Sequence, residues 1–359
     1  MKETQVLKEK TIGILGGGQL GKMLCEAALD LGYKTIVLDA NKDACAKQKT
    51  DFFINAKYDD KDALEKLAKN TCLITYEFEH IPTETIKLLE DFGANIPQGA
   101  RPLSLSQDRT KEKKALKKIN IPIVPYFEVL SKIDLEECAK KLGFPVILKT
   151  SLGGYDGKGQ WLIKDVEDLK KVKLENIAYV LEKAIDIKYE VSCIAVRAKN
   201  KEIELFPIAR NVHKNAILDI SQVPSPLSKD LEEKIKSYSK NIIEKLDFIG
   251  PLAIEYFISK DLKIYFNEMA PRPHNSGHFS LDACNISQFE LHLRSILGLE
   301  LIKPKLLRKV LMQNILGEDK KSIENLKSDK NTKVYLYGKD IWKKGRKMGH
   351  INILGDFIK

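Results

Sequence analysis

Several patterns that would restrict the function of this chain are missing from its sequence. Among 359 residues there are only six cysteines, and they are scattered with no Cys-x-x-Cys pair. Cys25, Cys138 and Cys193 fall in apolar patterns, which is typical of buried free thiols. We therefore expect core cysteines in a reducing compartment, with no disulfide framework.

Long hydrophobic runs are missing as well. No stretch approaches the ~18 uninterrupted apolar residues of a membrane-spanning helix. The charged segment 1–10 lacks the apolar region of a signal peptide. We therefore expect a cytoplasmic protein that has no membrane partner.

A basic run interleaved with aromatic residues is also missing. The formal net charge is +10, from 60 Lys and Arg against 50 Asp and Glu, and a basic balance invites a nucleic-acid hypothesis. The excess is thinly spread, and no zinc-finger or RNA-recognition pattern is present. We therefore expect a solvated lysine-rich surface and anionic small-molecule ligands, with no nucleic acid. The length predicts two or three domains.

The stretch most typical of a binding site is 145–161. It begins as a buried strand that carries Lys149, and it continues as a loop that contains Lys158 and the glycines Gly153, Gly154, Gly157 and Gly159. Glycines allow successive backbone N–H groups to turn toward one anion, and a lysine on the preceding strand adds a fixed positive charge. This combination suits a triphosphate, although the Walker pattern is absent. The alternative is a flexible hairpin tip.

A second glycine-rich turn lies near the N-terminus. A β-prone run at 11–15 meets Gly-Gly-Gly-Gln-Leu-Gly at 16–21, a helical pattern follows to Gly32, and a strand at 35–38 ends at Asp39. Gly-x-Gly-x-x-Gly in a β-α-β unit is typical of dinucleotide-binding domains and would indicate an NAD-dependent oxidoreductase. The motif is weak alone, and the helix N-terminus could instead bind a phosphate or polar edge of a substrate.

The remainder of the first hundred residues predicts a small doubly wound domain. Its further elements are strands at 52–54, 72–76 and 94–96 and helices at about 61–69 and 83–92. Glu77 and Glu79 follow the fourth strand, at the edge where ligands of open α/β sheets bind. These carboxylates are either ligand contacts or solvent-facing loop residues.

The middle of the chain predicts a hinged α+β unit. A basic helix at 104–118, which contains Arg109, is followed by a proline-marked linker. A helix at 135–142, the glycine loop and a strand at 160–163 then form a unit over 122–178 that could close over a ligand. Further strands are predicted at 179–181, 189–196, 206–210 and 215–220. His213, between the last two, is by itself most simply a structural residue.

Two carboxylates are predicted to meet in a hairpin. A turn at 259–262 places Glu255 opposite Phe266, so that Glu268 is its diagonal neighbour. Both glutamates lie in otherwise apolar strands, where an unpaired charge is costly. Together with the amide of Asn267 they suit Mg²⁺ bound by few carboxylates and by nucleotide phosphates. The alternative is a salt-bridged pair.

The segment that follows, 269–278, is rich in Arg, His, Asn and Ser. His274 and His278 have the i, i+4 spacing of some zinc sites, but the prolines near His274 argue against a helix. No cysteine or Glu-x-x-His pattern supports zinc. Beside a metal–triphosphate site the segment better suits a small oxyanion, which Arg272 could bind through two hydrogen bonds.

Taken together, these motifs resemble the ATP-grasp superfamily. The resemblance rests on Lys149, the loop 153–160, Glu182, Glu190, Glu255 and Asn267-Glu268. Within the superfamily, four further motifs are similar to the N5-carboxyaminoimidazole ribonucleotide synthetase family: the turn at 16–21, Tyr-Glu-Phe-Glu-His at 76–80, the segment 267–278 and Gln-Phe-Glu-Leu-His at 288–292. The resemblance runs from about residue 11 to 353.

This resemblance implies a fold and an activity. The fold is α/β and α+β, an ATP-grasp fold preceded by a doubly wound Rossmann-like N-terminal domain and followed by a small β-rich C-terminal domain. The implied boundaries are 1–100, 101–300 with a lid at about 122–178, and 301–359. The implied activity belongs to purine biosynthesis: ATP with Mg²⁺ phosphorylates bicarbonate to carboxyphosphate, and 5-aminoimidazole ribonucleotide is then carboxylated, with release of ADP and phosphate. A homodimer is also implied.

The resemblance further implies roles for individual residues. The expected ATP contacts are Arg109, Lys149, Gly154, Tyr155, Asp156, Gly157, Lys158, Gly159, Gln160, Glu182, Lys183, Ala184, Ile185, Glu190, His213, Asn267 and Glu268. The expected Mg²⁺ ligands are Glu255 and Glu268. The expected catalytic residues, which orient bicarbonate, are Arg272, His274 and Asn275. The expected ribonucleotide contacts are Gln19, Leu20, Tyr155, Asp156, Arg272, Arg346 and Lys347. The last two belong to a basic turn at 343–350 that would otherwise be a solvated charge run.

Three other functions compete with this interpretation. Another ATP-grasp carboxylase or ligase would share the ATP site and differ in the acceptor. An NAD-dependent dehydrogenase would use the turn at 16–21 and leave the glycine–lysine loop unexplained. A nucleic-acid-binding protein would show salt-dependent binding to unrelated sequences. Neither of the last two explains paired acidic positions beside a glycine–lysine loop.

Overall fold

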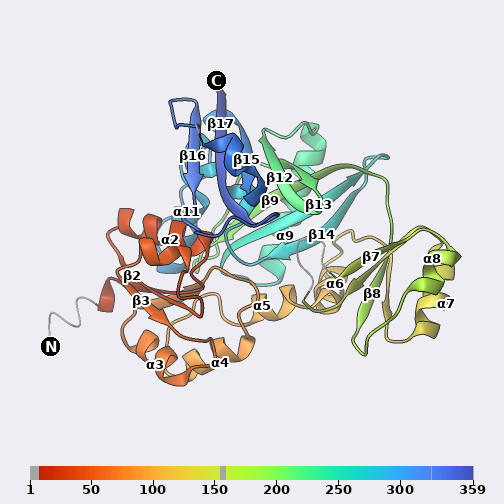
Figure 1. The fold of residues 1–359 in the computed structure, drawn as a ribbon, viewed down its shortest axis with the longest axis horizontal. Helices are drawn as coiled ribbons and strands as arrows, with labels where there is room; N and C mark the ends of the chain where they lie inside the picture. The colour runs from red at the N-terminus through yellow and green to blue at the C-terminus, as the bar shows by residue number, and fades with distance from the viewer. Residues whose placement is uncertain (1–7, 154–158, 325, 359) are drawn as a thin grey trace.

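The computed structural model describes residues 8–153, 159–324 and 326–358. Figure 1 shows an N-terminal α/β domain, a lid that projects to one side, and a central sheet that continues into the C-terminal strands. None of the helices in these described ranges is long and apolar enough to cross a bilayer.

The N-terminal domain is a parallel sheet with strand order β3-β2-β1-β4. Its strands are β1 Thr11–Leu15, β2 Lys34–Asp39, β3 Phe52–Asn55 and β4 Leu73–Tyr76. Its helices are α2 Gln19–Asp30, α3 Lys61–Lys69 and α4 Thr83–Asp91, and a short helix η1 covers Cys45–Gln48. α2 packs on one face of the sheet, whereas α3 and α4 pack on the other. The predicted β-α-β unit is confirmed.

The strand predicted at 94–96 is wrong, since this segment has no strand conformation. It contacts β4 through the Ile74 N–H, which donates to the Asn95 carbonyl at 2.9 Å. Pro97 follows directly after the segment, and a proline has no N–H with which to extend the ladder.

The helix predicted at 104–118 is in fact two helices, α5 Arg101–Ser106 and α6 Arg109–Lys118. The break lies at Asp108, whose backbone is extended and whose side chain accepts hydrogen bonds from the N–H groups of Thr110 and Lys111. An aspartate in this position caps a helix N-terminus, which explains why the helix restarts here. Arg109 therefore opens the first turn of α6.

The lid is an antiparallel sheet with strand order β5-β8-β6-β7 and two helices. Its elements are β5 Tyr126–Val129, α7 Lys132–Leu142, β6 Val146–Thr150, β7 Gln160–Ile163, α8 Val166–Lys171 and β8 Tyr179–Lys183. Leu135, Leu148 and Leu181 are buried between the sheet and its helices. The unit thus reaches Lys183, beyond the end expected at 178, because β8 lies between β5 and β6.

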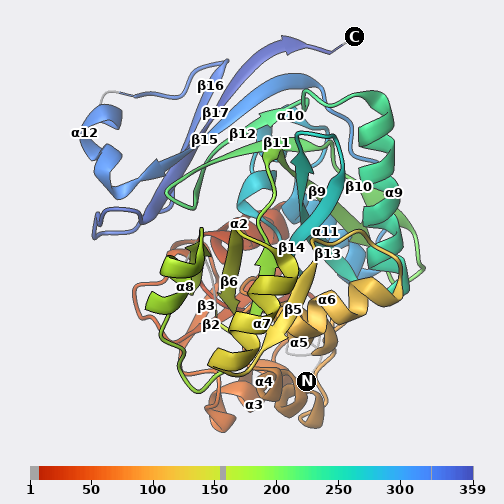
Figure 2. The ribbon, with the colours of Figure 1, turned by 90° about the vertical axis from the view of Figure 1, so that its right-hand side faces the viewer.

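The central sheet has nine strands, in the order β14-β13-β9-β11-β12-β15-β17-β16 with β10 paired to β9. The strands are β9 Ile187–Arg197, β10 Ile203–Leu205, β11 Ala209–Lys214, β12 Ile217–Val223, β13 Gly250–Ser259, β14 Ile264–Ala270, β15 Arg308–Leu316, β16 Thr332–Leu336 and β17 Lys347–Phe357. The C-terminal strands β15–β17 join this sheet through the pairing of β12 with β15 (Figure 2). The C-terminal part is β-rich, as predicted, but it is not a separate sheet.

The strands predicted around His213 differ from the observed ones. The structure has strands at 203–205 and 209–214 in place of 206–210, so His213 lies inside β11. Asn215 and Ala216 have positive φ values of 53° and 61° and form the turn before β12. A turn that requires left-handed backbone cannot be part of a strand, which is why the strand predicted at 215–220 begins later.

The remaining helices lie around the central sheet. They are α9 Lys229–Lys245, η2 Asn275–Gly277, α10 Ser280–Ala283, α11 Gln288–Leu297, η3 Gly317–Asp319 and α12 Lys320–Ile323. α11 is almost wholly buried. Its Phe289 and Leu293 belong to the core beneath α2, whereas Leu291 packs beneath the central sheet. α11 therefore joins the N-terminal domain to the rest of the molecule.

Candidate active site

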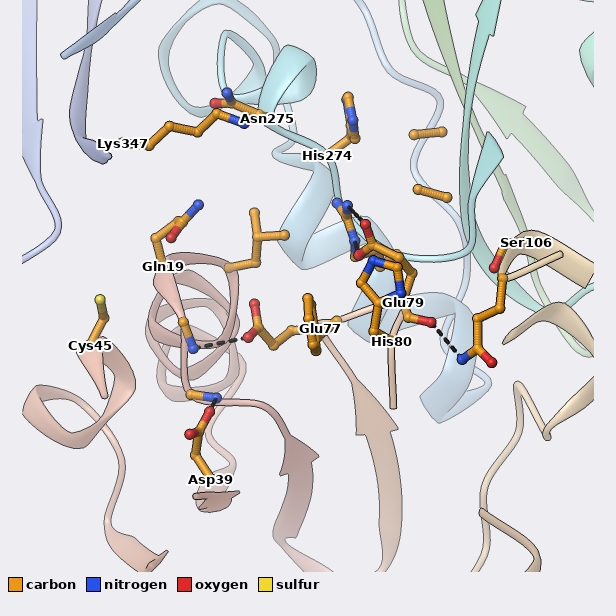
Figure 3. Close-up of a pocket in the computed structure, with 18 of the residues that line it drawn as sticks. Gln19, Asp39, Cys45, Glu77, Glu79, His80, Ser106, His274, Asn275 and Lys347 are labelled. Atoms are coloured by element: carbon orange, nitrogen blue, oxygen red, sulfur yellow. Dashed lines mark hydrogen bonds and ion pairs between the residues drawn. The ribbon is translucent and has the colours of Figure 1, made fainter. Parts of the chain in front are cut away.

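A cavity of about 700 Å³ lies where the N-terminal domain, the central sheet and the C-terminal strands meet. Figure 3 shows side chains from all three parts pointing into it. Ten of the predicted site residues line this cavity: Gln19, Leu20, Arg109, Glu255, Glu268, Arg272, His274, Asn275, Arg346 and Lys347. The fold therefore brings together residues that are more than three hundred positions apart in the sequence.

The glycine turn before α2 is occupied by side chains of the chain itself. Glu77 is buried, and its carboxylate accepts hydrogen bonds from the N–H groups of Gly18 (2.9 Å) and Gly21 (3.2 Å). Asp39 accepts one from Gly17 at 2.5 Å. The anion expected at this helix N-terminus is therefore Glu77, and the interpretation of Glu77 as a solvent-facing residue is wrong. Burial raises the pKa of Glu77 to about 7, and the glycine N–H groups oppose that shift.

Glu79 and Arg272 form an ion pair at the cavity wall. The Arg272 Nε and Nη2 atoms donate to the two Glu79 carboxylate oxygens, with the Nη2 distance at 2.7 Å. Burial opposes ionisation of Glu79, but the Arg272 charge and its hydrogen bonds outweigh burial and lower the pKa of Glu79 to about 2. Glu79 therefore holds the guanidinium charge of Arg272 at the cavity wall.

His274 and Asn275 also present polar groups to the cavity. The Nδ1 atom of His274 is 2.8 Å from Ser276 Oγ, and its Nε2 atom is 3.8 Å from Glu255. Burial and the nearby charges of Arg272 and Lys347 lower the pKa of His274, so its ring is neutral. Asn275 is buried, and neither its side-chain oxygen nor its nitrogen has a hydrogen-bond partner in the described part of the chain. An unpaired buried amide is costly, and Asn275 lines the cavity, so its amide is available to a ligand.

Glu255 and Glu268 are directly opposite each other on β13 and β14. The diagonal register predicted from the turn is wrong, because Asn267 is an extra residue in β14 that shifts the pairing between Glu255 and Tyr256. Burial, and then repulsion from Glu268, raise the pKa of Glu255 to about 8. Arg109 lies 3.8 Å from Glu268.

The residues of this acidic pair fit a divalent cation. Two carboxylates that face each other in a partly buried place repel unless a cation or proton lies between them. The described residues contain no group of three or more His, Cys, Asp or Glu side chains that could hold a metal. The pair therefore suits a cation such as Mg²⁺, which keeps several waters and completes its shell with phosphate oxygens.

On the lid, Glu182 binds two lysines. Lys149 on β6 and Lys113 on α6 each approach the Glu182 carboxylate at 2.8 Å, and all three side chains are buried. Burial opposes ionisation of Glu182, but the two lysine charges outweigh it and lower its pKa to about 2. The predicted Lys149 is thus confirmed as a buried cation at the end of a strand, and Lys113 is a partner that sequence reasoning missed.

Other predicted ATP contacts lie on the lid or on the central sheet and do not line the described cavity. Glu190 and His213, on the paired strands β9 and β11, are 2.7 Å apart. Gly159 has a φ of 70°, and a Cβ there would come within 2.7 Å of Thr150. The remaining described residues of this kind are Gln160, Lys183, Ala184, Ile185 and Asn267. Gly154, Tyr155, Asp156, Gly157 and Lys158 lie outside the described residues.

Sequence reasoning also missed Lys339. Its Nζ atom donates to Gln19 Oε1 at 3.0 Å and to the carbonyl of Lys347 at 2.7 Å, and it lines the cavity beside Arg346. Burial lowers the pKa of Lys339. A single lysine in a lysine-rich tail carries no signal in the sequence, because only the pairing of β16 with β17 brings it to Gln19.

Comparisons with known proteins cover nearly the whole chain. Family models match for a ribonucleotide synthetase preATP-grasp domain at 9–107, an ATP-grasp domain at 114–289 and a phosphoribosylaminoimidazole carboxylase C-terminal domain at 310–359. The N5-carboxyaminoimidazole ribonucleotide synthase of Bacillus subtilis (strain 168) is 43% identical over 346 residues, which is 96% of this chain and 91% of that protein. This chain belongs to the N5-carboxyaminoimidazole ribonucleotide synthase family.

Solved structures of the synthase family have the same fold. The ADP complex of an N5-carboxyaminoimidazole ribonucleotide synthetase superposes with a TM-score of 0.92 at 43% identity, covering 97% of this chain and 93% of that one. The synthase of Aspergillus clavatus, solved with ADP and 5-aminoimidazole ribonucleotide, gives 0.88 at 28% identity, covering 97% and 94%. The predicted fold class and the resemblance to the synthase family are confirmed.

Proposed function

We propose that this protein is an ATP-dependent ligase that carboxylates 5-aminoimidazole ribonucleotide with bicarbonate, by way of carboxyphosphate, and releases ADP and phosphate. The observation that carries this proposal is the single cavity in which the acidic pair Glu255 and Glu268 lies beside Arg272, His274 and Asn275. Family membership supports the same reaction, which belongs to purine biosynthesis.

The acidic pair and the lid form the ATP half of the proposed site. Glu255 and Glu268 would hold Mg²⁺, which neutralises the charge of the triphosphate. Lys149 is held in place by Glu182 and would contact the phosphates together with Arg109 and the loop 154–160. The backbone at 182–185 would contact the adenine, and Glu190 would bind the ribose hydroxyls next to His213. Asn267 would lie beside the metal.

The loop around Arg272 forms the bicarbonate half. Bicarbonate is a poor electrophile because hydroxide is a poor leaving group, and transfer of the γ-phosphoryl group to one bicarbonate oxygen converts that oxygen into a good leaving group. Arg272, His274 and Asn275 would orient the carbonate end and exclude water, which would otherwise hydrolyse carboxyphosphate. The lowered pKa of His274 makes its ring a weak base, so the proton lost by the attacking amine would leave with the phosphate.

The ribonucleotide would bind on the remaining wall. Its phosphate suits the cations Arg346, Lys347 and Lys339, which come from the C-terminal strands and line the same cavity. Gln19 and Leu20 of α2 would close the pocket over the ribose and base, and Tyr155 and Asp156 would contact the base from the lid. The amine then attacks the carbonyl carbon of carboxyphosphate, and phosphate leaves.

Three further properties belong to this proposal. The division into 1–100, 101–300 and 301–359 is supported by the three matched family models; the lid belongs to the second part and includes β8 up to Lys183. A homodimer is supported only by the resemblance. A cytoplasmic location is supported by cysteines that are free in the structure.

The proposal is tested by measuring ADP release from ATP, Mg²⁺ and bicarbonate, with and without 5-aminoimidazole ribonucleotide. We expect the ribonucleotide to stimulate release strongly, and only when bicarbonate is present. ATP turnover that does not respond to the ribonucleotide would indicate an ATP-grasp ligase with another acceptor. No turnover under any of these conditions would contradict the proposal.

A further inference from the structure

The motif Gln-Phe-Glu-Leu-His at 288–292 contributes no residue to the cavity, yet it contacts the loop 271–278 that carries Arg272, His274 and Asn275. Gln288 is completely buried in the first turn of α11. Its Oε1 atom accepts a hydrogen bond from the His274 N–H at 2.8 Å, and its Nε2 atom donates to the His274 carbonyl at 2.7 Å. One side-chain amide thus satisfies both backbone groups of a proposed catalytic residue.

The loop packs closely against Gln288 at a second point, Gly277. A Cβ atom on Gly277 would lie 2.5 Å from Gln288 Oε1 and 2.2 Å from the side chain of Ile194, so only glycine fits there. Ser280 connects the two segments, because its Oγ atom accepts from the Gln288 N–H at 3.0 Å and donates to the Gly277 carbonyl at 2.6 Å. The backbone at 274–277 therefore has no room to shift without moving Gln288.

His292, one helical turn further along α11, reaches the other end of the loop through two side chains. Its Nε2 atom is 2.8 Å from the hydroxyl of Thr75, which donates to Gln98 Oε1. Gln98 Nε2 in turn donates to the carbonyl of Pro271 at 3.2 Å. Thr75 and His292 are completely buried, and Gln98 is nearly so.

The directions of these hydrogen bonds are determined by the chemistry of the groups. The Pro271 carbonyl can only accept, so Gln98 directs its NH₂ group toward it and its oxygen toward Thr75. The single Thr75 proton is used on Gln98, so the Nε2 atom of His292 must carry a proton and donate to Thr75. Burial lowers the pKa of His292 to about 3, which is consistent with a neutral ring.

We propose that Gln288 and His292 are positioning residues that hold the two ends of the loop 271–278 at the geometry required for carboxylation. Gln288 acts directly on the backbone of His274, and His292 acts through Thr75 and Gln98 on Pro271. Because Thr75 lies on β4 of the N-terminal domain, this network also sets the loop relative to Gln19 and Glu79. The expected loss of kcat rests on the proposed function. The expected loss of order in the loop 271–278 does not depend on which reaction the protein catalyses.

The kinetic test compares Gln288→Glu with Glu290→Gln. The first variant keeps the shape of the side chain but replaces the NH₂ donor by an oxygen that faces the His274 carbonyl. The second is the matched change on the same helix, where Glu290 contacts Arg294 at 2.7 Å, away from the loop. Since a displacement of about 1 Å can cost about a hundredfold in rate, we expect Gln288→Glu to lower kcat by about 10- to 100-fold.

The pattern of the loss distinguishes positioning from general damage. In Gln288→Glu we expect the KM for ATP to stay within about twofold and more ADP to form per carboxylated ribonucleotide, because carboxyphosphate is then poorly shielded from water. Glu290→Gln should behave like the wild type. Unchanged kcat and coupling in Gln288→Glu would overturn the inference. The inference would also be overturned if Gln288→Glu lowered ATP affinity and melting temperature along with kcat, because that pattern would indicate a structural role alone.

Amide hydrogen exchange tests the inference without any assumption about the reaction. The wild type should protect the backbone N–H groups of 272 and 274–278, since Pro271 and Pro273 have none. Gln288→Glu should lose protection there while the central strand β9 keeps it. Thr75→Val, which removes the hydroxyl but keeps the shape, provides a second variant if Gln288→Glu does not fold, and it should deprotect the same segment. Unchanged protection in the folded variants would overturn the inference. A wild type that forms no carboxylated ribonucleotide would contradict only the proposed function.

Discussion

Glu77 lies beneath the N-terminus of α2, where its Oε1 atom accepts a hydrogen bond from the Gly18 N–H at 2.9 Å. The turn at 16–21 has the spacing of a dinucleotide-binding motif, yet the position of the pyrophosphate is taken by the carboxylate of Glu77, which directly follows β4. Asp39, the acid that would bind a ribose in that motif, instead accepts a hydrogen bond from Gly17. The glycines therefore allow Glu77 and Asp39 to approach the backbone closely and to occupy its N–H groups. This arrangement argues against NAD binding at this turn.

Gly16→Ala should be markedly destabilising. Gly16 has a φ of 96°, and a Cβ there would lie 2.7 Å from Glu77 Oε1. Gly32 is the matched control, because it also has a positive φ of 78° but nothing lies within 4 Å of its Cβ position. Strain alone should cost Gly32→Ala about 1–2 kcal/mol, and the clash should cost Gly16→Ala about 1–3 kcal/mol more. Urea denaturation measures both, and equal losses would mean that Glu77 moves away freely.

Glu268→Gln should abolish ATP turnover while the protein stays folded. Removing one carboxylate of the facing pair leaves Glu255 alone to hold the cation, so the loss should exceed about a hundredfold in kcat if the metal carries the phosphoryl transfer. Asp261→Asn, in the exposed turn of the same hairpin, is the control and should keep full turnover. Circular dichroism and melting temperature establish the fold, and near-normal ADP release by Glu268→Gln would exclude the metal assignment.

Arg346→Ala should weaken ribonucleotide binding and leave ATP affinity little changed. Arg346 lines the cavity beside Lys339 and Lys347, and all three come from the C-terminal part of the chain, which carries none of the proposed ATP contacts. A lost hydrogen bond to a charged phosphate is worth about 1.5–3 kcal/mol, or about 10- to 100-fold in affinity. Lys344→Ala, in the same basic turn but outside the cavity lining, should bind normally. Calorimetric titration with each nucleotide measures this, and parallel loss of both ligands would show that the turn is structural.

His350→Gln should change how stability depends on pH. His350 is completely buried, stacks on His278 with ring centroids 4.6 Å apart, and lies 3.0 Å from the Tyr337 hydroxyl. Burial, with a smaller effect of His278, lowers the pKa of His350 well below its ordinary value. The unfolded chain therefore binds a proton below about pH 6.5 that the folded chain does not, so each unit of pH below 6.5 costs the wild type about 1.4 kcal/mol through His350.

The variant lacks this titration. Its deficit in free energy of unfolding at pH 7 should therefore shrink by about 2 kcal/mol at pH 5. Denaturant titrations of both proteins at the two pH values measure the difference, in which contributions from other titrating groups cancel. A deficit that stays constant with pH would mean that His350 is protonated in the folded protein.

Local pattern was sufficient for much of the site. A strand that carries Lys149 and two glutamates in apolar strands joined by a turn are both short-range features, and the structure shows both. The register between β13 and β14 could not be predicted, because the extra residue Asn267 in β14 shifts it and the sequence carries no distinct signal of that shift. The break before Arg109 was missed for a similar reason, since an aspartate inside a basic helical pattern can be either a surface residue or a cap.

By itself, the sequence of this protein determined its α/β and α+β class, the elements that carry the proposed phosphate and metal ligands, and its family resemblance, because these depend on periodicity and on motifs within short segments. Only the tertiary structure decided which distant residues share a site. It placed Glu77 under the glycine turn, paired Glu79 with Arg272, brought Lys339 to Gln19 and set Gln288 against His274. Such contacts join separate elements, and their partners are selected by packing and by the cost of leaving buried polar groups unpaired.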